Sequence, residues 1–412
     1  MAKIDDSVKK KVPELRFKGF TDDWEERKLG ELSNIVGGGT PSTSNSEYWD
    51  GDIDWYAPAE IGEQRYVSKS KKTITELGLK KSSARILPVG TVLFTSRAGI
   101  GNTAILGKEA TTNQGFQSIV PNPNKLDSYF IYSRTNELKR YGEVTGAGST
   151  FVEISGKQMS KMSIMVPELS EQKKIGSFFE QLDNTIALHQ RKLDLLKEQK
   201  KGYLQKMFPK NGAKVPELRF AGFADDWEER KLGELSNIVG GGTPSTSNPE
   251  YWDGDIDWYA PAEIGEQSYV SKSKKTITEL GLKKSSARIL PVGTVLFTSR
   301  AGIGNTAILG KEATTNQGFQ SIVPDQNKLD SYFIYSRTNE LKRYGEVTGA
   351  GSTFVEVSGK QMSKMSIMIP ELSEQKKIGS FFKQLDNTIA LHQRKLDLLK
   401  EQKKGYLQKM FV

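Results

Sequence analysis

The chain has 412 residues, enough for about two or three domains that each bury a core. Its 59 Lys and Arg residues against 50 Asp and Glu give a formal net charge of +9, which favours a polyanionic partner, nucleic acid before membrane. The lack of cysteine excludes a disulfide framework, a thiolate nucleophile and a cysteine metal site. The start MAKIDDSVKK has no apolar signal core, and no run of about 18 apolar residues occurs, so we expect a soluble cytoplasmic protein without a membrane partner.

The dominant feature is an internal repeat. Residues 12–208 recur at 215–411 with nine differences in 197 aligned positions. The differing pairs are Lys18/Ala221, Thr21/Ala224, Ser46/Pro249, Arg65/Ser268, Asn122/Asp325, Pro123/Gln326, Ile154/Val357, Val166/Ile369 and Glu180/Lys383. Two copies this similar must adopt the same fold and present the same surface chemistry.

The first part of each repeat has the pattern of a compact, β-rich α+β domain. Short β-like runs occur at 91–96, 116–120 and 161–167, and Gly, Pro and Asn turns separate them. A helical pattern at 129–141 interrupts these runs. We therefore predict a globular domain at 1–167 and its copy at 211–370.

After Pro167 the pattern changes to that of one long helix, with no proline and two glycines before residue 208. We expect Ser170 to be its N-cap and Pro209 to end it, which places helices within 168–210 and 371–412. Residues alternate at steps of four and three along a seam, the 3.5-residue period of a coiled coil. The seam positions are Ile175, Phe179, Leu182, Ile186, His189, Leu193, Leu196, Lys200, Tyr203 and Met207. The obvious partner of each helix is the other one, and a face shared with a different protein is the alternative.

The stretch SRAGIGNTAILGKEATTNQG at 96–115 superficially resembles nucleotide-binding motifs. A dinucleotide fingerprint requires a helix after the glycine turn, but the residues that follow Gly101 have no amphipathic period. A phosphate loop requires four residues between its glycines, whereas five separate Gly101 from Gly107, and Glu109 occupies the position of the magnesium-binding Ser or Thr. We therefore expect no nucleotide site here.

Other enzyme motifs are equally weak. The two histidines, His189 and His392, both lie in the helical seam, where a polar residue more often sets register than catalyses. The motif PELSEQK resembles a nuclease metal cluster, but Glu168 and Glu171 lie at a helix start, which indicates a charged first turn. No adenine methylation motif and no helicase phosphate loop occur. We expect no catalysis, no metal and no cofactor on this chain.

The order of motifs resembles the specificity subunit of type I restriction-modification systems. The residues that carry the resemblance are WEERKLGEL, GGGTPSTSNSEYWDGDIDWYAPAEI, SSARILPVGTVLFTSRAGIGNTAI, TTNQGFQSI and VPELSEQKKIGSFFEQLD. This series covers nearly the whole chain twice. The chain departs from the family in one respect, because its two recognition domains, usually unrelated in sequence, are almost the same.

The resemblance implies a role for each part. Each globular domain is expected to be a target recognition domain that reads half of a bipartite site in double-stranded DNA. The helices at 168–210 and 371–412 are expected to be spacers that pack as an antiparallel coiled coil with pseudo-two-fold symmetry. Two methyltransferase subunits are expected to dock beside them, joined by restriction and translocase subunits in the full complex. S-adenosylmethionine, ATP and magnesium are then expected on those partners only.

The loops supply side chains suited to DNA. Arg97 can bond bidentately to guanine, and Asn113 or Gln114 to adenine. Glycines at 37–39 and 99–101 allow close backbone approach, and Lys69, with the lysines at 71 and 72, can neutralise phosphates. For each residue the alternative is a turn or a solvated surface. The predicted DNA-binding residues are Thr40, Ser42, Thr43, Lys69, Arg97, Asn102, Asn113, Gln114, Ser149 and Thr150, with Thr243, Ser245, Thr246, Lys272, Arg300, Asn305, Asn316, Gln317, Ser352 and Thr353 in the second repeat.

Trp49, Trp55 and Tyr56 are interpreted as core or loop-bracing residues rather than as base-stacking residues. Two rival functions remain. A metal-dependent nuclease or fused restriction enzyme would need clustered acids in the globular part, and a coiled-coil scaffold would bind protein instead of DNA.

Overall fold

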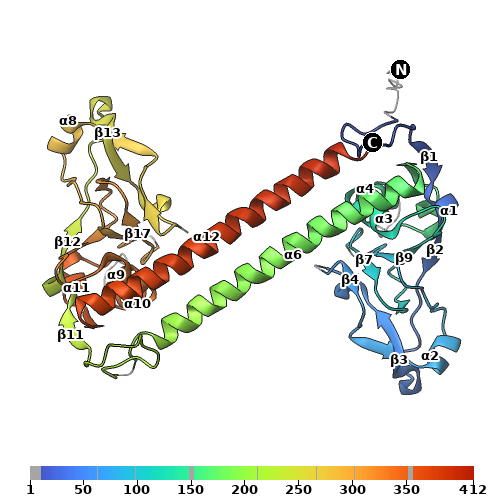
Figure 1. Cartoon of the computed structure of the whole chain (residues 1–412), viewed down its shortest axis with the longest axis horizontal. Coiled ribbons are helices and arrows are strands. Elements are labelled where there is room, and N and C mark those ends of the chain that lie inside the picture. Colours follow the sequence, from blue (N-terminus) through green and yellow to red (C-terminus); the bar gives the residue numbers. More distant parts are fainter. Residues whose placement is uncertain are drawn as a thin grey trace. The chain divides into compact units, whose positions relative to one another are not determined.

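The computed structural model of the chain describes residues 11–62, 64–97, 99–147, 153–210, 212–265, 267–300, 302–350 and 356–412 (Figure 1). The chain divides into two compact units. One comprises Met1–His189 with Lys395–Val412, and the other comprises Gln190–Arg394. Each unit therefore contains one β-rich domain, the first half of the helix that follows it and the last part of the other long helix.

The strands of the first repeat are short, and most are bounded by turns. They are β1 (Glu25–Lys28), β2 (Ser33–Gly37), β3 (Trp49–Tyr56), β4 (Tyr66–Val67), β5 (Lys72–Ile74), β6 (Val92–Phe94), β7 (Thr103–Leu106), β8 (Thr111–Thr112), β9 (Gln117–Pro121) and β10 (Ser163–Val166). The helices are α1 (Leu29–Leu32), α2 (Glu76–Lys80), α3 (Ser128–Ser133), α4 (Thr135–Gly146), α5 (Gly156–Met159) and α6 (Leu169–Lys206), with 3-10 turns at Ser46–Tyr48 and Pro58–Glu60.

The second repeat has the same elements in the same order. Its strands are β11 (Glu228–Lys231), β12 (Ser236–Gly240), β13 (Trp252–Tyr259), β14 (Tyr269–Val270), β15 (Lys275–Ile277), β16 (Val295–Phe297), β17 (Thr306–Leu309), β18 (Thr314–Thr315), β19 (Gln320–Pro324) and β20 (Ser366–Ile369). Its helices are α7 (Leu232–Leu235), α8 (Glu279–Lys283), α9 (Ser331–Ser336), α10 (Thr338–Gly349), α11 (Gly359–Ser363) and α12 (Leu372–Lys409), with 3-10 turns at Pro249–Tyr251 and Pro261–Glu263.

Three sheets build each domain. In the first repeat a five-stranded sheet has the order β2-β9-β6-β7-β4, and a three-stranded sheet has the order β5-β3-β8. The pairs β4–β7 and β3–β8 are parallel, while β1 pairs antiparallel with β10. Strands β6 and β7 are buried along their whole length, which explains their continuous apolar runs VLF and TAIL.

The main core lies where α3 and the first turns of α6 meet the five-stranded sheet. Phe94, Phe130 and Phe179 are fully buried in one cluster that also contains Met410, near the end of α12. The ring of Phe411 stacks on Phe179 at a centroid distance of 5.8 Å. A segment that the sequence places last therefore completes the core of the first domain.

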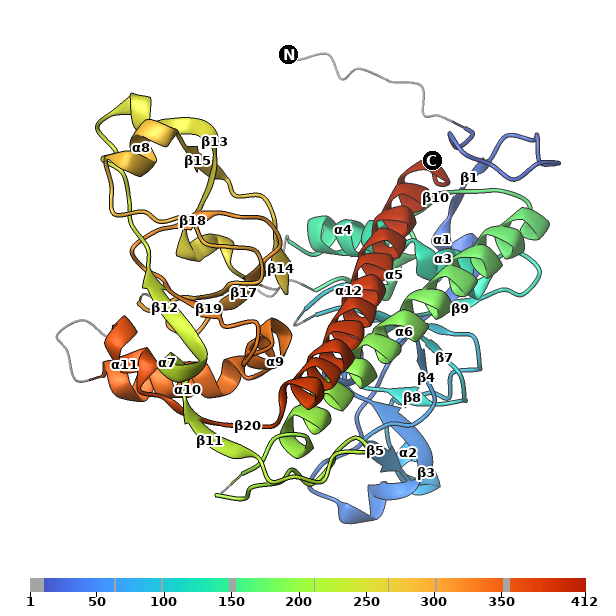
Figure 2. The same cartoon turned by 60° about the vertical axis from the view of Figure 1, so that its left-hand side comes forward.

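Within each unit the long helices pack antiparallel. In the first unit Phe178 of α6 contacts Tyr406 of α12 at a centroid distance of 5.0 Å, and Asp183 pairs with Lys403 at 2.7 Å. Residue numbers thus rise along α6 as they fall along α12, and Figures 1 and 2 both draw these turns side by side. Equivalent contacts in the second unit join α6 to α12 through Lys200 and Asp386 at 2.5 Å.

The predicted fold class, β-rich α+β domains with long helices, is confirmed. Two local predictions are wrong. Ser170 is not the N-cap, because α6 begins at Leu169 and the carbonyl of Glu168 accepts the amides of Glu171 and Gln172. The single helix predicted at 129–141 is instead two helices, α3 and α4, which are separated at Arg134. No helix in the described ranges has both the length and the apolarity needed to cross a bilayer.

Candidate nucleic-acid interface

Three of the predicted DNA-binding residues meet at one point of each domain. Thr40 follows β2, and Asn113 and Gln114 lie in the loop between β8 and β9. The Thr40 hydroxyl donates to the Gln114 side-chain carbonyl and accepts from the Asn113 amide at 3.2 Å. Asn113 also accepts the Gly115 amide at 2.7 Å, so it braces this loop while Gln114 stays exposed. We name Thr40, Arg97, Asn113 and Gln114 the loop cluster.

Arg97 belongs to this cluster because of its position beside Gly115. A Cβ atom at Gly115 would lie 3.6 Å from Arg97 Nε and 3.1 Å from Asn113 Oδ1. The guanidinium is 3.9 Å from the carboxylate of Glu153, and the two residues form an isolated β-bridge. About two fifths of the Arg97 side chain is solvent-accessible (39%), so the guanidinium is oriented by its partner yet available to a ligand. No sequence signal predicted Glu153, because its pairing with Arg97 is made only by the fold.

The same cluster occurs in the second repeat. Thr243 donates to Gln317 and accepts from Asn316 at 3.1 Å, while Arg300 lies 4.0 Å from Glu356. None of the nine positions at which the repeats differ belongs to this cluster.

The other predicted residues that the structure describes lie outside the loop cluster. The Ser42 hydroxyl hydrogen bonds with that of Ser44 at 2.8 Å, and the Ser42 carbonyl accepts the Trp49 indole N–H at 3.1 Å. Thr43, Lys69 and Asn102 are exposed, and the corresponding residues of the second repeat are Ser245, Thr246, Lys272 and Asn305. Ser149, Thr150, Ser352 and Thr353 lie outside the described residues.

The amides of Gly38 and Gly39 are bonded within the domain. The Gly39 amide donates to Thr112 at 2.8 Å, and a Cβ atom on Gly38 would lie 2.0 Å from the Asn113 carbonyl oxygen. This strand end therefore needs glycine for close packing against the β8–β9 segment. The carbonyl of Gly39 accepts the Trp55 indole N–H at 2.8 Å, which confirms that Trp55 braces the loop from the core.

The stretch that resembled a nucleotide site has a structural role. Gly101 has φ +97°, and the residues after it form strand β7 rather than a helix. Lys108 pairs with Asp54 at 2.8 Å, and the other oxygen of Asp54 accepts the amide and hydroxyl of Ser70. Burial alone would raise the pKa of Asp54, but the Lys108 ammonium and the Ser70 hydrogen bonds outweigh it and lower that pKa. The strand after the glycine turn and the Asp54–Lys108 pair thus account for the glycines and the lysine that resembled a nucleotide-binding motif.

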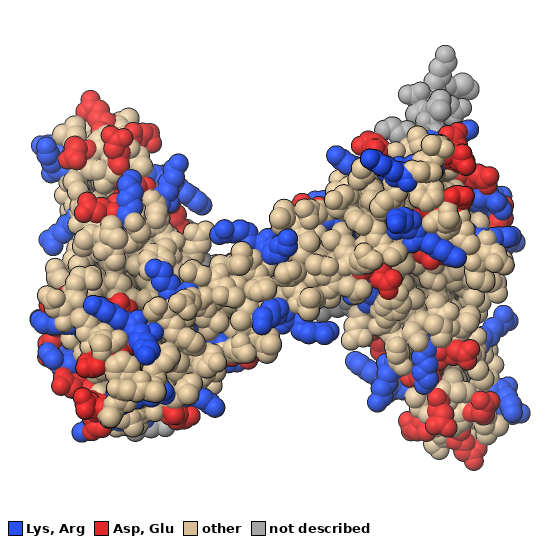
Figure 3. Space-filling view, viewed as in Figure 1, with Lys and Arg blue, Asp and Glu red and all other residues tan. Residues whose placement is uncertain are grey.

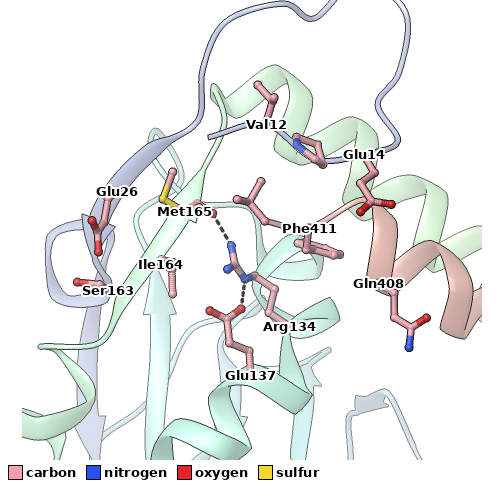
Figure 4. Close-up of a pocket in the computed structure, with 12 residues that line it drawn as sticks. Val12, Glu14, Glu26, Arg134, Glu137, Ser163, Ile164, Met165, Gln408 and Phe411 are labelled. Carbon is pink, nitrogen blue, oxygen red and sulfur yellow. Dashed lines mark hydrogen bonds and ion pairs between the residues drawn. The ribbon is translucent and has the colours of Figure 1, made fainter. Parts of the chain in front are cut away.

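A cavity of about 420 Å³ lies in the first unit, between β10, α4 and the end of α12, and Figure 4 draws the residues that line it. Its central group is Arg134, which donates to Glu137 at 2.6 Å and also to the Met165 carbonyl. The guanidinium lies over the rings of Phe130 and Phe411. Arg337 makes equivalent contacts in the second repeat, so this arginine joins the domain to the helix end in both copies.

The acidic PELSEQK motif does not form a metal centre. Glu171 is fully buried, and both of its oxygens accept hydrogen bonds from Arg16, each at 2.7 Å. Among the residues that the structure describes, no group of three or more His, Asp or Glu side chains could hold a metal ion. On the face drawn in Figure 3, Lys and Arg side chains are interspersed with Asp and Glu rather than gathered in one patch.

The fold and the loop cluster define a duplicated recognition module, with one polar, arginine-containing surface presented twice by a single chain. The comparisons give the family. The sequence model of a protein family, described as the type I restriction modification DNA specificity domain, matches residues 21–198 and again 224–401. The chain belongs to this family of type I restriction-modification specificity subunits.

Relatives agree with this assignment. The MjaIX type I restriction enzyme specificity subunit of Methanocaldococcus jannaschii is 27% identical over 411 residues, which cover 94% of this chain and 92% of that protein. The EcoR124I/EcoR124II specificity subunit of Escherichia coli is 30% identical over 177 residues, or 41% of this chain and 43% of that protein. The crystal structure of a type I S subunit from M. genitalium has the same fold, with a TM-score of 0.65 at 15% identity over 97% of this chain and 99% of that one.

Proposed function

We propose that this chain reads an interrupted palindrome in double-stranded DNA and itself carries out no catalysis. The observation that carries the proposal is the duplicated loop cluster, whose residues and contacts are the same in both repeats. Equal side chains in equal geometry select equal bases, so each repeat reads the same half-site. Arg97 and Arg300 would hydrogen bond to guanine, and Gln114 and Gln317 to adenine.

The inverted order of the half-sites is supported by the helices. Because α6 and α12 pack antiparallel within each unit, the two domains attach to oppositely directed helices. Two-fold symmetry in a protein is mirrored by a palindromic site, with half-site centres about 10 base pairs apart or somewhat more. The expected site has a few specified bases, an unspecified gap and the inverted complement.

The partners in this proposal are two methyltransferase subunits, one per repeat, and restriction subunits in the full complex. Equivalent grooves support this number. One groove of about 500 Å³ lies between α4 and Lys400, Lys403 and Lys404 of α12. Its counterpart of about 560 Å³ lies between α10 and the equivalent lysines of α6. S-adenosylmethionine, ATP and magnesium would be bound by the partners, in the cytoplasm.

Mapping of modified adenines in cells that express this chain with its methyltransferase tests the proposal. We expect one half-site to recur in inverted orientation, with the equivalent adenine modified in each half. Two unrelated half-sites, or a direct repeat, would contradict it. A single methyltransferase bound at saturation, measured by native mass spectrometry, would contradict the stoichiometry.

Single substitutions test the reading residues directly. R97A and R300A should each weaken binding to the mapped site by about 5- to 100-fold and by the same factor, because each removes one bidentate base contact. R140A, which removes an exposed arginine of α4, is the matched control for lost positive charge. If R97A weakens binding no more than R140A does, Arg97 does not read a base.

A further inference from the structure

Two of the nine differences between the repeats meet each other in space. In the first unit Arg65, which precedes edge strand β4, contacts α6 next to Glu180. Its guanidinium donates to the Glu180 carbonyl at 3.4 Å, to Asn184 Oδ1 at 2.9 Å and to the Tyr129 hydroxyl at 3.3 Å. The neighbouring Tyr66 hydroxyl donates to the Glu180 carboxylate at 2.8 Å. The edge of the recognition domain is thus hydrogen bonded directly to the long helix.

The second unit has a different arrangement at the same place. Ser268 replaces Arg65, and its hydroxyl lies 3.3 Å from that of Tyr335, which belongs to the domain and not to the long helix. Lys383 replaces Glu180, and its ammonium lies 4.9 Å from the centre of the Tyr269 ring. A cation–π contact at an exposed site stabilises less than a set of charge-assisted hydrogen bonds.

The two substitutions depend on each other electrostatically. An arginine at 268 would approach α12 at the position of Lys383, where two cations would repel each other. A lysine at 180 would likewise lie beside Arg65 and would lose the bond from Tyr66. The combinations Arg–Glu and Ser–Lys avoid this repulsion, whereas the mixed combination Arg–Lys does not.

One hydrogen bond between domain and helix is the same in both units. Tyr129 donates to Asp183 at 2.8 Å in the first unit, and Tyr332 donates to Asp386 at 2.8 Å in the second. The Tyr–Asp contact is therefore shared by both copies, the contacts at positions 65 and 180 and their counterparts differ, and the loop cluster that would read DNA stays the same.

We propose that the pairs Arg65–Glu180 and Ser268–Lys383 set how firmly each recognition domain is held on its long helix, so that the second copy accepts a wider range of half-site placement than the first. These are positioning residues, and the inference rests on the proposed reading of a bipartite site. The firmer hold in the first unit comes from the hydrogen bonds of Arg65 and Tyr66 to α6. The second domain has the same loop cluster but is held less firmly on α12.

Hydrogen exchange in the full chain tests the attachment without DNA. Peptides that include position 65 or 268 differ in mass, so the two copies report separately. We expect slower exchange around Tyr66 than around Tyr269, by about threefold or more, the factor of a net hydrogen bond. S268R/K383E should slow the second copy to the level of the first, whereas S268R alone should not. N122D, which also replaces a residue of the first repeat by its counterpart in the second, is the control and should leave hydrogen exchange at both sites unchanged. Equal exchange in both copies, or an equal effect of S268R with and without K383E, would overturn the proposal.

Duplexes whose gap is lengthened or shortened by one base pair test the consequence for DNA. Relative to the native gap, we expect S268R/K383E to lose about threefold more affinity on the altered gaps than the wild type does. R65S/E180K should lose less than the wild type. An unchanged tolerance in both variants would refute the role in placement. If the wild type binds no bipartite duplex, both the proposed reading of DNA and the proposed role in half-site placement are refuted. The hydrogen-exchange result would still decide whether the first domain is held more firmly on its helix than the second.

Discussion

Removal of Arg16 should destabilise the first unit far more than removal of an exposed arginine. Arg16 lies in the segment before β1, and its guanidinium pairs bidentately with Glu171 in the first turn of α6. The Glu171 side chain has no solvent exposure, and that of Arg16 has 14%. In R16A the Glu171 carboxylate would remain buried without its counter-ion.

The expected cost follows from this geometry. Breaking a buried ion pair by removing one partner costs about 3–5 kcal/mol, because an uncompensated charge stays in a medium of low dielectric constant. The lower end applies here, since Arg16 lies near the surface and its loss would admit water to the carboxylate. We therefore expect R16A to lower the free energy of unfolding by about 3 kcal/mol. R219A should act in the same way on Glu374, which has the same pairing in the second unit.

Urea unfolding, followed with hydrogen exchange of the first turns of α6, measures the effect in the affected unit. R27A is the matched control, because Arg27 pairs with Glu31 in an exposed Arg–Glu contact and its removal should change stability little. The double variant R16M/E171M should recover most of the loss, since it removes both charges. An R16A variant no less stable than R27A would refute the reasoning.

Two further predictions concern the small sheet and the glycine turn. The lowered pKa of Asp54 means that its ionised form stabilises the fold at pH values above its unfolded pKa of about 4 and that this contribution is lost as the pH falls further. The stability difference between wild type and D54N should therefore shrink below about pH 4 in acid titrations, and a constant difference would contradict the role of the Lys108 pair. G101A should destabilise more than G99A in thermal unfolding, although both residues have positive φ, because a Cβ atom on Gly101 would lie 3.0 Å from the Lys139 Cα while that on Gly99 has no neighbour within 4 Å. Equal losses in these two variants would show that backbone strain alone accounts for both glycines.

Local patterns in the sequence predicted the elements whose cause is local. Strand β6 lies within the run at 91–96, β9 overlaps the run at 116–120 and extends one residue beyond it, and the long proline-free segment forms α6. The ten seam positions from Ile175 to Met207 are all buried or half-buried, as the heptad spacing required. The expectation that no nucleotide site lies here also rested on the sequence alone, because the residues after Gly101 lack the amphipathic period of a phosphate-binding helix, and in the structure they form β7.

The break at Arg134 could not be predicted in this way. The sequence there contains neither Gly nor Pro, and at the break the buried Arg134 guanidinium bonds to β10 and lies against Phe411. These contacts join residues that are far apart in the chain.

The duplicated sequence by itself determined that this protein has two equal domains, two long helices and two equal polar surfaces, since identical residues have identical propensities and packing. Only the tertiary structure decided which residues act together. It placed Arg97 beside Glu153 and packed the glycines at 38 and 39 against the backbone of neighbouring segments. It also completed the core of the first domain with residues from the end of α12. It also showed that Arg65 and Tyr66 hydrogen bond to Glu180 of α6. The physical reason is that hydrogen bonds and ion pairs act over a few ångströms in space, and a fold brings within that distance residues that no local pattern in the sequence relates.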